Sequence, residues 1–324
     1  MRQEGITKTG ITATTKMDLW ELGINASGTW SLAYDDDTLP NDQAGGWFKA
    51  TCTALDATVG AADYVILTHK IEGYNYKSLY KKSQTVSFWA KSNKTGTYAV
   101  ALRNSAAPDR SYVATFAIDA ANTAEKKTVV LTAFPSGGTW NFTTGIGLSI
   151  SITFVCGSTY QTSADAWQSG NYFGTSSNVN LADANNNYFS IAELQLEEGI
   201  YATAFERKMY QQEVDFVQRY YEKSYNMAHA PGTVTEEGAE SWEATAAAVE
   251  NFHRVVFKQR KAAIPAITVY SSGTGTAGQL TREGTGDVAA ETIRVGEIGF
   301  CIYNVAANYG NDQLIAHWVA DIRL

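Results

Sequence analysis

The stretch Leu148-Ser149-Ile150-Ser151-Ile152-Thr153-Phe154-Val155-Cys156 alternates between apolar and small polar side chains. A period of two is that of a β-strand, in which successive side chains point to opposite faces of a sheet. Leu148, Ile150, Ile152, Phe154 and Cys156 would share one face, whereas Ser149, Ser151 and Thr153 would share the other. We therefore predict a strand with one face in a hydrophobic core.

Alternating segments of the same kind recur through the first two hundred residues. They include residues 86–90, 98–102 and 129–133. Turn-forming sequences separate them, among them Asn93-Lys94-Thr95-Gly96 and Pro135-Ser136-Gly137-Gly138. Several short strands at this spacing are typical of a β-sandwich or jelly roll.

Strand signals resume after Pro231-Gly232 and predict a second, smaller β-sandwich that ends in a paired C-terminal strand. Residues 239–250 leave two interpretations open, because Ala and Glu favour helix while the neighbouring segments favour strand. The alternating segments are residues 255–257, 267–269, 298–302 and 318–324.

Residues 205–222 interrupt the β pattern. Tyr210, Val214, Val217 and Tyr221 are spaced as one face of a helix, with no Gly or Pro between them. This apolar stripe either packs on the chain's own sandwich or against further copies of the chain. The predicted chain is thus all-β: an N-terminal jelly-roll β-sandwich (1–204), one connecting amphipathic helix (205–225) and a smaller C-terminal β-sandwich (226–324).

Charge, hydrophobicity and cysteine spacing argue against a nucleic-acid-binding, membrane-inserted or disulfide-linked protein. The net charge of −8 and the pI of about 5.1 disfavour nucleic-acid binding, because an acidic surface repels phosphates. No apolar run is long enough for membrane insertion, and the first five residues lack the apolar core of a secretory signal. Cys52, Cys156 and Cys301 are isolated from one another, which predicts neither metal clips nor disulfides and fits folding in a reducing cytoplasm.

Several ordered motifs together resemble a family of bacteriophage tail-fibre and receptor-binding virion proteins. The resemblance extends from about residue 65 to the end of the chain and is strongest over residues 157–225. The motifs are GSTYQT (157–162), AWQSGN (166–171), YFSIAELQLEEG (188–199), ATAFER (202–207), VQRYYEKSY (217–225), IEGY (71–74), TVSFWAKS (85–92) and the terminal ADIRL (320–324).

The resemblance implies a jelly roll similar to carbohydrate-binding domains, then the helix, then a small distal sandwich. It also implies a virion location (tail or fibre) after synthesis in the host bacterial cytoplasm, a homotrimer, and other phage tail or virion proteins as partners. We expect a receptor-binding protein that contacts host cell-surface polysaccharide. Two alternatives stay open: a purely structural virion subunit (decoration, baseplate or fibre connector) and a polysaccharide-degrading enzyme.

Aromatic residues are the best candidates for glycan contact, because flat rings stack on the apolar faces of sugars. Tyr74 and Tyr76 lie in a turn rich in Gly and Asn, Trp47 follows Gly45-Gly46, and Trp89 alternates opposite Phe88. We therefore predict Trp47, Tyr74, Tyr76 and Trp89 as ligand-binding residues. The alternative for each is packing inside the jelly roll.

Asp35, Asp37 and Asp42 are the candidate metal ligands. Ca²⁺ prefers several oxygen ligands, and this loop offers three carboxylates. The sequence has no EF-hand spacing, and the alternative is a solvated acidic turn. Apart from this possible structural calcium, we expect no cofactor.

Motifs of catalysis and nucleotide binding are missing from the sequence. Residues 273–278 match GxGxxG formally, but two further glycines follow at once, so we predict a hairpin loop in place of the helix that binds a dinucleotide. None of the four His lies at metal-binding spacing, and we expect His317 on the surface because it alternates with Trp318. We accordingly expect that the chain is not an enzyme.

Overall fold

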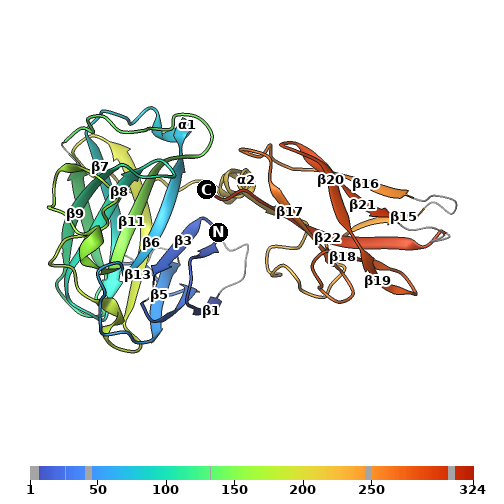
Figure 1. Ribbon diagram of the computed structural model, residues 1–324, viewed down its shortest axis with the longest axis horizontal. Helices are drawn as coiled ribbons and strands as arrows, with labels where there is room; N and C mark the ends of the chain where they lie inside the picture. Colours follow the sequence, from blue (N-terminus) through green and yellow to red (C-terminus); the bar gives the residue numbers. More distant parts are fainter. Residues whose placement is uncertain (1–6, 26, 41–45, 132, 245–249, 306–310) are drawn as a thin grey trace. The chain divides into compact units, whose positions relative to one another are not determined.

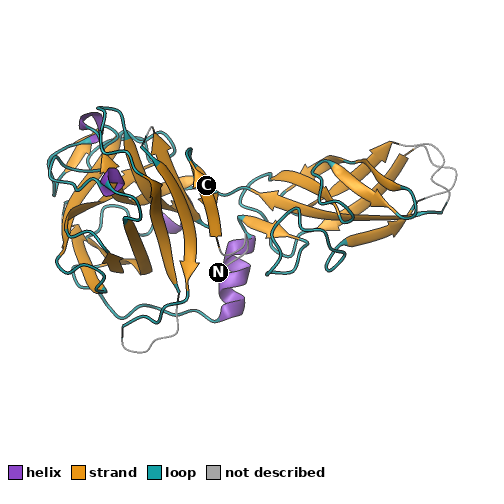
Figure 2. Ribbon diagram, turned by 90° about the horizontal axis from the view of Figure 1, so that it is seen from below, coloured by secondary structure: helices purple, strands orange, loops and turns teal. Residues whose placement is uncertain are grey.

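The computed structural model describes residues 7–25, 27–40, 46–131, 133–244, 250–305 and 311–324. Nearly all of its regular structure is β-strand, so the prediction of an all-β fold is confirmed (Figure 2). The chain divides after Arg207 into two compact units, the second of which is Lys208–Arg323. Within the described ranges, no helix has the length and hydrophobicity needed to cross a lipid bilayer.

The first unit is a jelly-roll sandwich of two antiparallel sheets (Figure 1). One sheet contains, in spatial order, β1 (Thr7–Ile11), β4 (Thr29–Asp35), β5 (Trp47–Ala54), β13 (Tyr188–Glu198), β7 (Gln84–Ser92) and β10 (Glu125–Leu131). The other contains β12 (Trp167–Ser169), β9 (Arg110–Ile118), β8 (Gly96–Asn104), β11 (Ile146–Cys156), β6 (Tyr64–Glu72), β3 (Trp20–Asn25) and β2 (Thr15–Met17). Short helical turns are α1 (Gly73–Tyr76), η1 (Ser158–Tyr160) and η2 (Leu181–Asp183).

Strand β11 confirms the alternation from which the fold was predicted. Its apolar side chains between Leu148 and Phe154 point into the core between the two sheets. A register shift between Thr153 and Val155 then reverses the alternation, and Cys156 packs with Phe173 outside that core. The expectation that Cys156 shares the face of Leu148 is therefore wrong, because a β-bulge places an extra residue in the strand.

The polar face of β11 is also buried. Ser149, Ser151 and Thr153 are almost inaccessible to solvent. Residues 160–174 cross this face, and the hydroxyl of Thr153 donates a hydrogen bond of 2.6 Å to the carbonyl of Phe173. The sheet that contains β11 is thus covered on its outer face by the chain itself.

The second unit is a smaller sandwich with its own core, as predicted. That core contains, among others, Val255, Phe300, Leu314 and Trp318. Its larger sheet consists of β14 (Tyr221–Lys223), β22 (Gln313–Asp321), β18 (Gln279–Arg282) and β19 (Gly286–Ala289), with β15 (Glu240–Glu243) and β17 (Ala266–Ser271) also paired to β22. The smaller sheet consists of β16 (Glu250–Val256), β21 (Gly299–Val305) and β20 (Glu291–Gly296).

Helix α2 (Tyr210–Gln218) is shorter than the helix predicted over residues 205–222. The backbone N–H of Tyr220 bonds to the carbonyl of Val217 at 2.9 Å and closes the last turn. Tyr221 then begins β14 and pairs with Asp321 of β22. Helix propensity is overridden here because the backbone gains ladder partners on β22.

The expectation that His317 lies on the surface is wrong, since its exposed fraction is 0%. Its ring stacks on Tyr225 with the centroids 3.7 Å apart. The hydroxyl of Ser224 donates to Nδ1 at 2.9 Å, and Nε2 donates to the carbonyl of Thr235 at 2.9 Å. His317 and Trp318 are neighbours on β22 and therefore point to opposite faces of the strand, but both side chains are buried because other parts of the chain cover both faces.

The three cysteines are free and buried. Burial raises the pKa of the Cys156 thiol to about 12, so it is protonated at neutral pH. Residues 273–278 form the predicted connection between two strands. There the N–H of Ser271 bonds to the carbonyl of Thr276 at 3.0 Å, and no helix follows.

Candidate functional site

The four aromatic residues predicted to bind a ligand lie in two places. Trp47 is 2% exposed and packs in a small apolar cluster that includes the half-buried Trp89. Tyr76 is 0% exposed and Tyr74 is 57% exposed, and both belong to α1. Of the four, Tyr74 alone presents most of its ring to solvent, and a ligand contact of these residues stays a prediction.

The candidate calcium ligands have lysine partners. Asp35 lies 3.8 Å from the ammonium group of Lys49, and Asp37 lies 3.2 Å from that of Lys91. Asp42 lies outside the described residues. In the part of the chain that the structure describes, no group of three or more His, Cys, Asp or Glu side chains is placed to hold a metal ion. A structural calcium here stays a prediction.

A band of aromatic side chains lies at the α1 end of the first unit. We call Tyr80, Trp140, Phe142 and Trp167 the aromatic rim; each ring is partly exposed. Ring centroids are 4.8 Å apart between Phe142 and Tyr80, 5.0 Å between Tyr80 and Trp140, and 5.5 Å between Trp140 and Trp167. The buried ring of Tyr76 stacks on Trp140 at 5.6 Å. The rim is therefore a continuous row of rings supported from below.

The loop before the rim holds both indoles in place. Nε1 of Trp140 donates to the carbonyl of Gly137 at 2.9 Å, and Nε1 of Trp167 donates to the carbonyl of Ala133 at 3.0 Å. Gly137 has a φ of 68°, a conformation that favours glycine, which lets the loop turn back toward Trp140. With both N–H groups satisfied by backbone, the rings are oriented before any ligand arrives.

Asp109 fixes the same loop from the side. Its carboxylate accepts a hydrogen bond of 2.6 Å from the amide of Asn104 and one of 3.0 Å from the backbone N–H of Thr139. These bonds, that of Asn104 first, hold the pKa of Asp109 below its usual value. The carboxylate is thus ionised at neutral pH and serves the loop structure.

The electrostatics of the rim are those of a neutral surface. Burial raises the pKa of Tyr76 to about 12, although a hydrogen bond from Gln84 opposes the shift, so this phenol stays uncharged. The ammonium group of Lys81 lies 5.4 Å from the ring centroid of Tyr80. Neighbouring rings of the rim are inclined to one another by 48° to 71°. An apolar row of this kind with a cation at its edge suits a neutral or anionic sugar chain.

Sequence reasoning did not select Trp140 or Trp167 as binding residues. Trp140 comes shortly after Gly137-Gly138, just as Trp47 follows Gly45-Gly46, so the signal used for Trp47 applied equally to Trp140. The neighbourhood of Trp140 and Trp167 depends on the pairing of β12 with β9. A contact between residues so far apart in the sequence cannot be predicted from the local sequence pattern.

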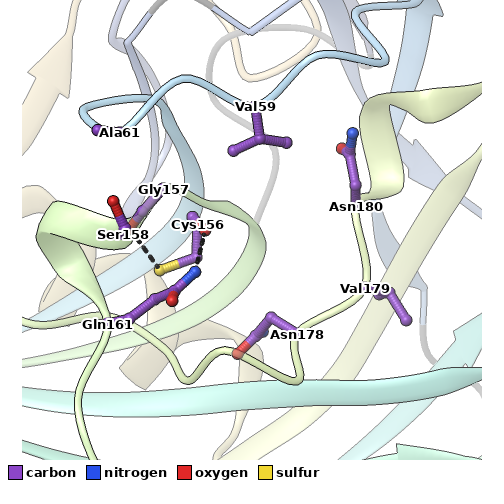
Figure 3. A pocket seen from close by; sticks show the side chains of 9 residues that line it. All are labelled: Val59, Ala61, Cys156, Gly157, Ser158, Gln161, Asn178, Val179 and Asn180. Atoms are coloured by element: carbon purple, nitrogen blue, oxygen red, sulfur yellow. Dashed lines mark hydrogen bonds between the residues drawn. The ribbon is translucent and has the colours of Figure 1, made fainter.

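A pocket of about 310 Å³ opens at the other end of the first unit (Figure 3). We call it the amide pocket. It lies where residues 59–61, 156–161 and 178–180 converge. Ligand pockets commonly enclose about 300–1,000 Å³, so its volume admits a small ligand. Its lining residues are Val59, Ala61, Cys156, Gly157, Ser158, Gln161, Asn178, Val179 and Asn180.

The second unit has a wider, open hollow of about 670 Å³ at the end of β15, β18 and β22. Glu243, Glu283 and Asp312 are among its lining residues. Asp312 is paired with Arg282, whose Nε lies 2.6 Å from the carboxylate. The excess of carboxylates makes this hollow unfavourable for anionic polysaccharides.

No protein-family model and no curated protein matches this sequence. Among solved structures, the enzymatically active domain of bacteriophage CBA120 tailspike protein 4 is similar with a TM-score of 0.33 and 12% identity. That match covers 56% of this chain and 19% of the tailspike chain, so the chain spans about a fifth of that protein.

Two carbohydrate-binding modules are similar at the same level. The family 11 module of the Clostridium thermocellum cellulase Lic26A-Cel5E has a TM-score of 0.32 and 11% identity, over 62% of this chain and 99% of that one. The CBM22-1 xylan-binding domain of Paenibacillus barcinonensis Xyn10C has a TM-score of 0.28 and 9% identity, over 61% and 99%. At these values the similarities carry no argument; the fold rests on the sheet order described above.

Proposed function

We propose that this chain is a glycan-binding subunit of a bacteriophage virion, of tail-fibre or receptor-binding type, and that it is not an enzyme. The observation that supports this function is the aromatic rim, a row of partly exposed rings with preset orientation. Sugars present C–H faces that pack on such rings, while their hydroxyl groups stay in water. The row would lie along several consecutive sugar units of a polysaccharide chain.

The virion location, the homotrimer and the phage partners in this proposal derive from the sequence motifs. The sequence motifs indicate a phage protein and the rim suits a glycan, so we propose host cell-surface polysaccharide as the ligand. Because the rim carries no charge of its own, discrimination between polysaccharides would come from ring spacing and from polar groups at its edge, such as Lys81.

The test is binding of the fluorescently labelled full chain to bacterial cells and purified surface polysaccharides, with and without Trp140→Leu. Leu preserves apolar packing but removes the flat ring. Trp242→Leu is the matched control, because Trp242 is likewise partly buried but belongs to the second unit. We expect saturable binding that falls at least tenfold in Trp140→Leu and is unchanged in Trp242→Leu.

Other outcomes would favour the alternatives. A folded protein that binds no polysaccharide of its host would be a structural virion subunit. Release of new reducing ends from a bound polysaccharide would identify a degrading enzyme and overturn the proposal. Equal losses of binding in both variants would place the ligand away from the rim.

A further inference from the structure

We propose that the amide pocket binds the acetamido group of an N-acetylated amino sugar. The pocket lies at the Tyr64 end of β6 and the Cys156 end of β11, whereas the aromatic rim lies at their Glu72 and Ile146 ends. Strands rise about 3.3 Å per residue, so the two places are roughly 30 Å apart along β6. The proposed site is thus separate from the rim and does not depend on the rim's ligand.

Three amide side chains line the pocket, and each is anchored at one end. Nε2 of Gln161 donates to the carbonyl of Cys156 at 2.8 Å, and Oδ1 of Asn180 accepts from the N–H of Ala182 at 2.9 Å. Oε1 of Gln161 is therefore left as an acceptor. Nδ2 of Asn180 donates two long hydrogen bonds of 3.4 Å, to the carbonyls of Asp56 and Ala57, which a ligand acceptor can replace. Oδ1 of Asn178 accepts from the N–H of Thr175 at 2.9 Å, and its Nδ2 is buried without a hydrogen-bond partner among the described residues.

Apolar and hydroxyl groups complete the lining. Figure 3 shows the side chain of Val59 between Asn180 on one side and Cys156 on the other. Ser158 is exposed and adds a hydroxyl that rotates to donate or accept. Among the lining residues that the structure describes, none carries a charge.

An acetamido group has one N–H donor, one carbonyl acceptor and one methyl group. These match the Gln161 acceptor, the Asn180 donor and the methyl groups of Val59. A free amino sugar would bring an ammonium ion that finds no carboxylate in the lining, and burying an unpaired charge is costly. A plain hydroxyl would leave the valine surface uncovered, so the lining selects the acetamido group over both.

The test is titration of the full chain with N-acetylglucosamine, glucosamine and glucose, followed by ligand-observed saturation-transfer NMR. We expect saturable binding of N-acetylglucosamine alone, with the strongest transfer to its acetamido methyl group. Binding of glucose or glucosamine with equal affinity would overturn the acetamido assignment. No saturable binding by the folded protein would overturn the site.

Ser158→Trp locates the site, because the added ring fills the pocket without removing a structural hydrogen bond. Thr159→Trp is the matched control: Thr159 is the next residue, is also exposed and does not line the pocket. We expect at least a tenfold loss of N-acetylglucosamine binding in Ser158→Trp and none in Thr159→Trp. Trp140→Leu separates this proposal from the function of the rim, because this variant should bind N-acetylglucosamine as the unmodified chain does. Binding that survives Ser158→Trp, or that is lost in Trp140→Leu, would contradict the assignment of N-acetylglucosamine to the amide pocket.

Discussion

Lys261 and Glu222 form a buried ion pair inside the second unit. The exposed fractions of their side chains are 0% and 1%, and Nζ lies 2.5 Å from Oε2. Nζ also donates to the carbonyls of Gln218 and Gln259, and Oε1 of Glu222 accepts from the backbone N–H of Lys258 at 3.0 Å. The pair therefore ties the end of α2, strand β14 and the chain after β16 together.

The stability losses from removing the two members of this pair should not add up. Lys261→Met leaves a buried carboxylate without its cation, a change that typically costs about 3–5 kcal/mol of unfolding free energy. In Glu222→Gln/Lys261→Met no buried charge is left, so we expect a smaller loss than the sum of the two single variants. Denaturant unfolding of the four proteins measures this coupling, and strictly additive losses would contradict it.

His317 should make the second unit sensitive to acid. Burial is the main cause that lowers its pKa below the ordinary value of 6.5. The hydrogen bond to the carbonyl of Thr235 and the charge of Glu240 oppose this shift, and His229 adds to it. The folded state then binds fewer protons than the unfolded state, so the unfolding free energy is highest above pH 6.5 and falls as the pH drops below that value. His317→Gln should lower the unfolding free energy near neutral pH but reduce its dependence on pH. Denaturant unfolding from pH 7.5 to 5 measures both effects. If the pH dependence is unchanged by the substitution, His317 is not its source.

At the scale of elements, the covering segment 160–174 explains why β11 is buried on both faces. The guanidinium of Arg103, on the neighbouring β8, lies 4.6 Å from the ring centroid of Phe173 and donates to Asn171 at 3.0 Å. Phe173 in turn stacks on Tyr160 with the centroids 4.5 Å apart. A cation, two aromatic rings and backbone hydrogen bonds thus fasten the segment to the outer face of its sheet.

Phe173→Ala should loosen this segment. The buried ring is 2% exposed, and loss of such a side chain costs about 3–5 kcal/mol. Phe134→Ala is the matched control, because Phe134 is 52% exposed and should change stability by less than about 0.5 kcal/mol. Hydrogen exchange of residues 160–174 should accelerate in the first variant alone; equal protection in both would mean that Phe173 does not hold the segment.

At the scale of the whole molecule, two hydrophobic cores are separate. The core of the first unit and that of the second share no residue among those described. Each unit also has its own sheets, and none of the described strands pairs across the division at Arg207. We therefore expect each unit to have its own free energy of unfolding.

Calorimetry should resolve this division. Ile152→Ala creates a cavity in the first core and Leu314→Ala one in the second, each with a cost of about 2–4 kcal/mol. We expect each variant to lower the midpoint of one transition by several degrees and to leave the other unchanged. A single transition that shifts equally in both variants would show that the units unfold together.

The sequence by itself determined the class of the fold, which is an all-β chain with two sandwiches and a helix between them. Side-chain alternation is a local property, so it predicts β11, β22 and the second sandwich. The isolation of the three cysteines follows directly from their spacing in the sequence. Local pattern was insufficient where contacts with another part of the chain decided the structure. Tyr221 pairs with β22 and so does not belong to the predicted helix. A β-bulge places Cys156 outside the core, and other segments of the chain bury His317.

The tertiary structure alone decided which polar faces are buried and which side chains meet. Trp140 and Trp167 come from a loop and from an edge strand, and only the pairing of β12 with β9 brings them to one surface. The amide pocket likewise needs three loops that are distant in the sequence. A site made from separate segments is absent from any single stretch of sequence, because its geometry exists only once the sheets have set the ends of those segments side by side.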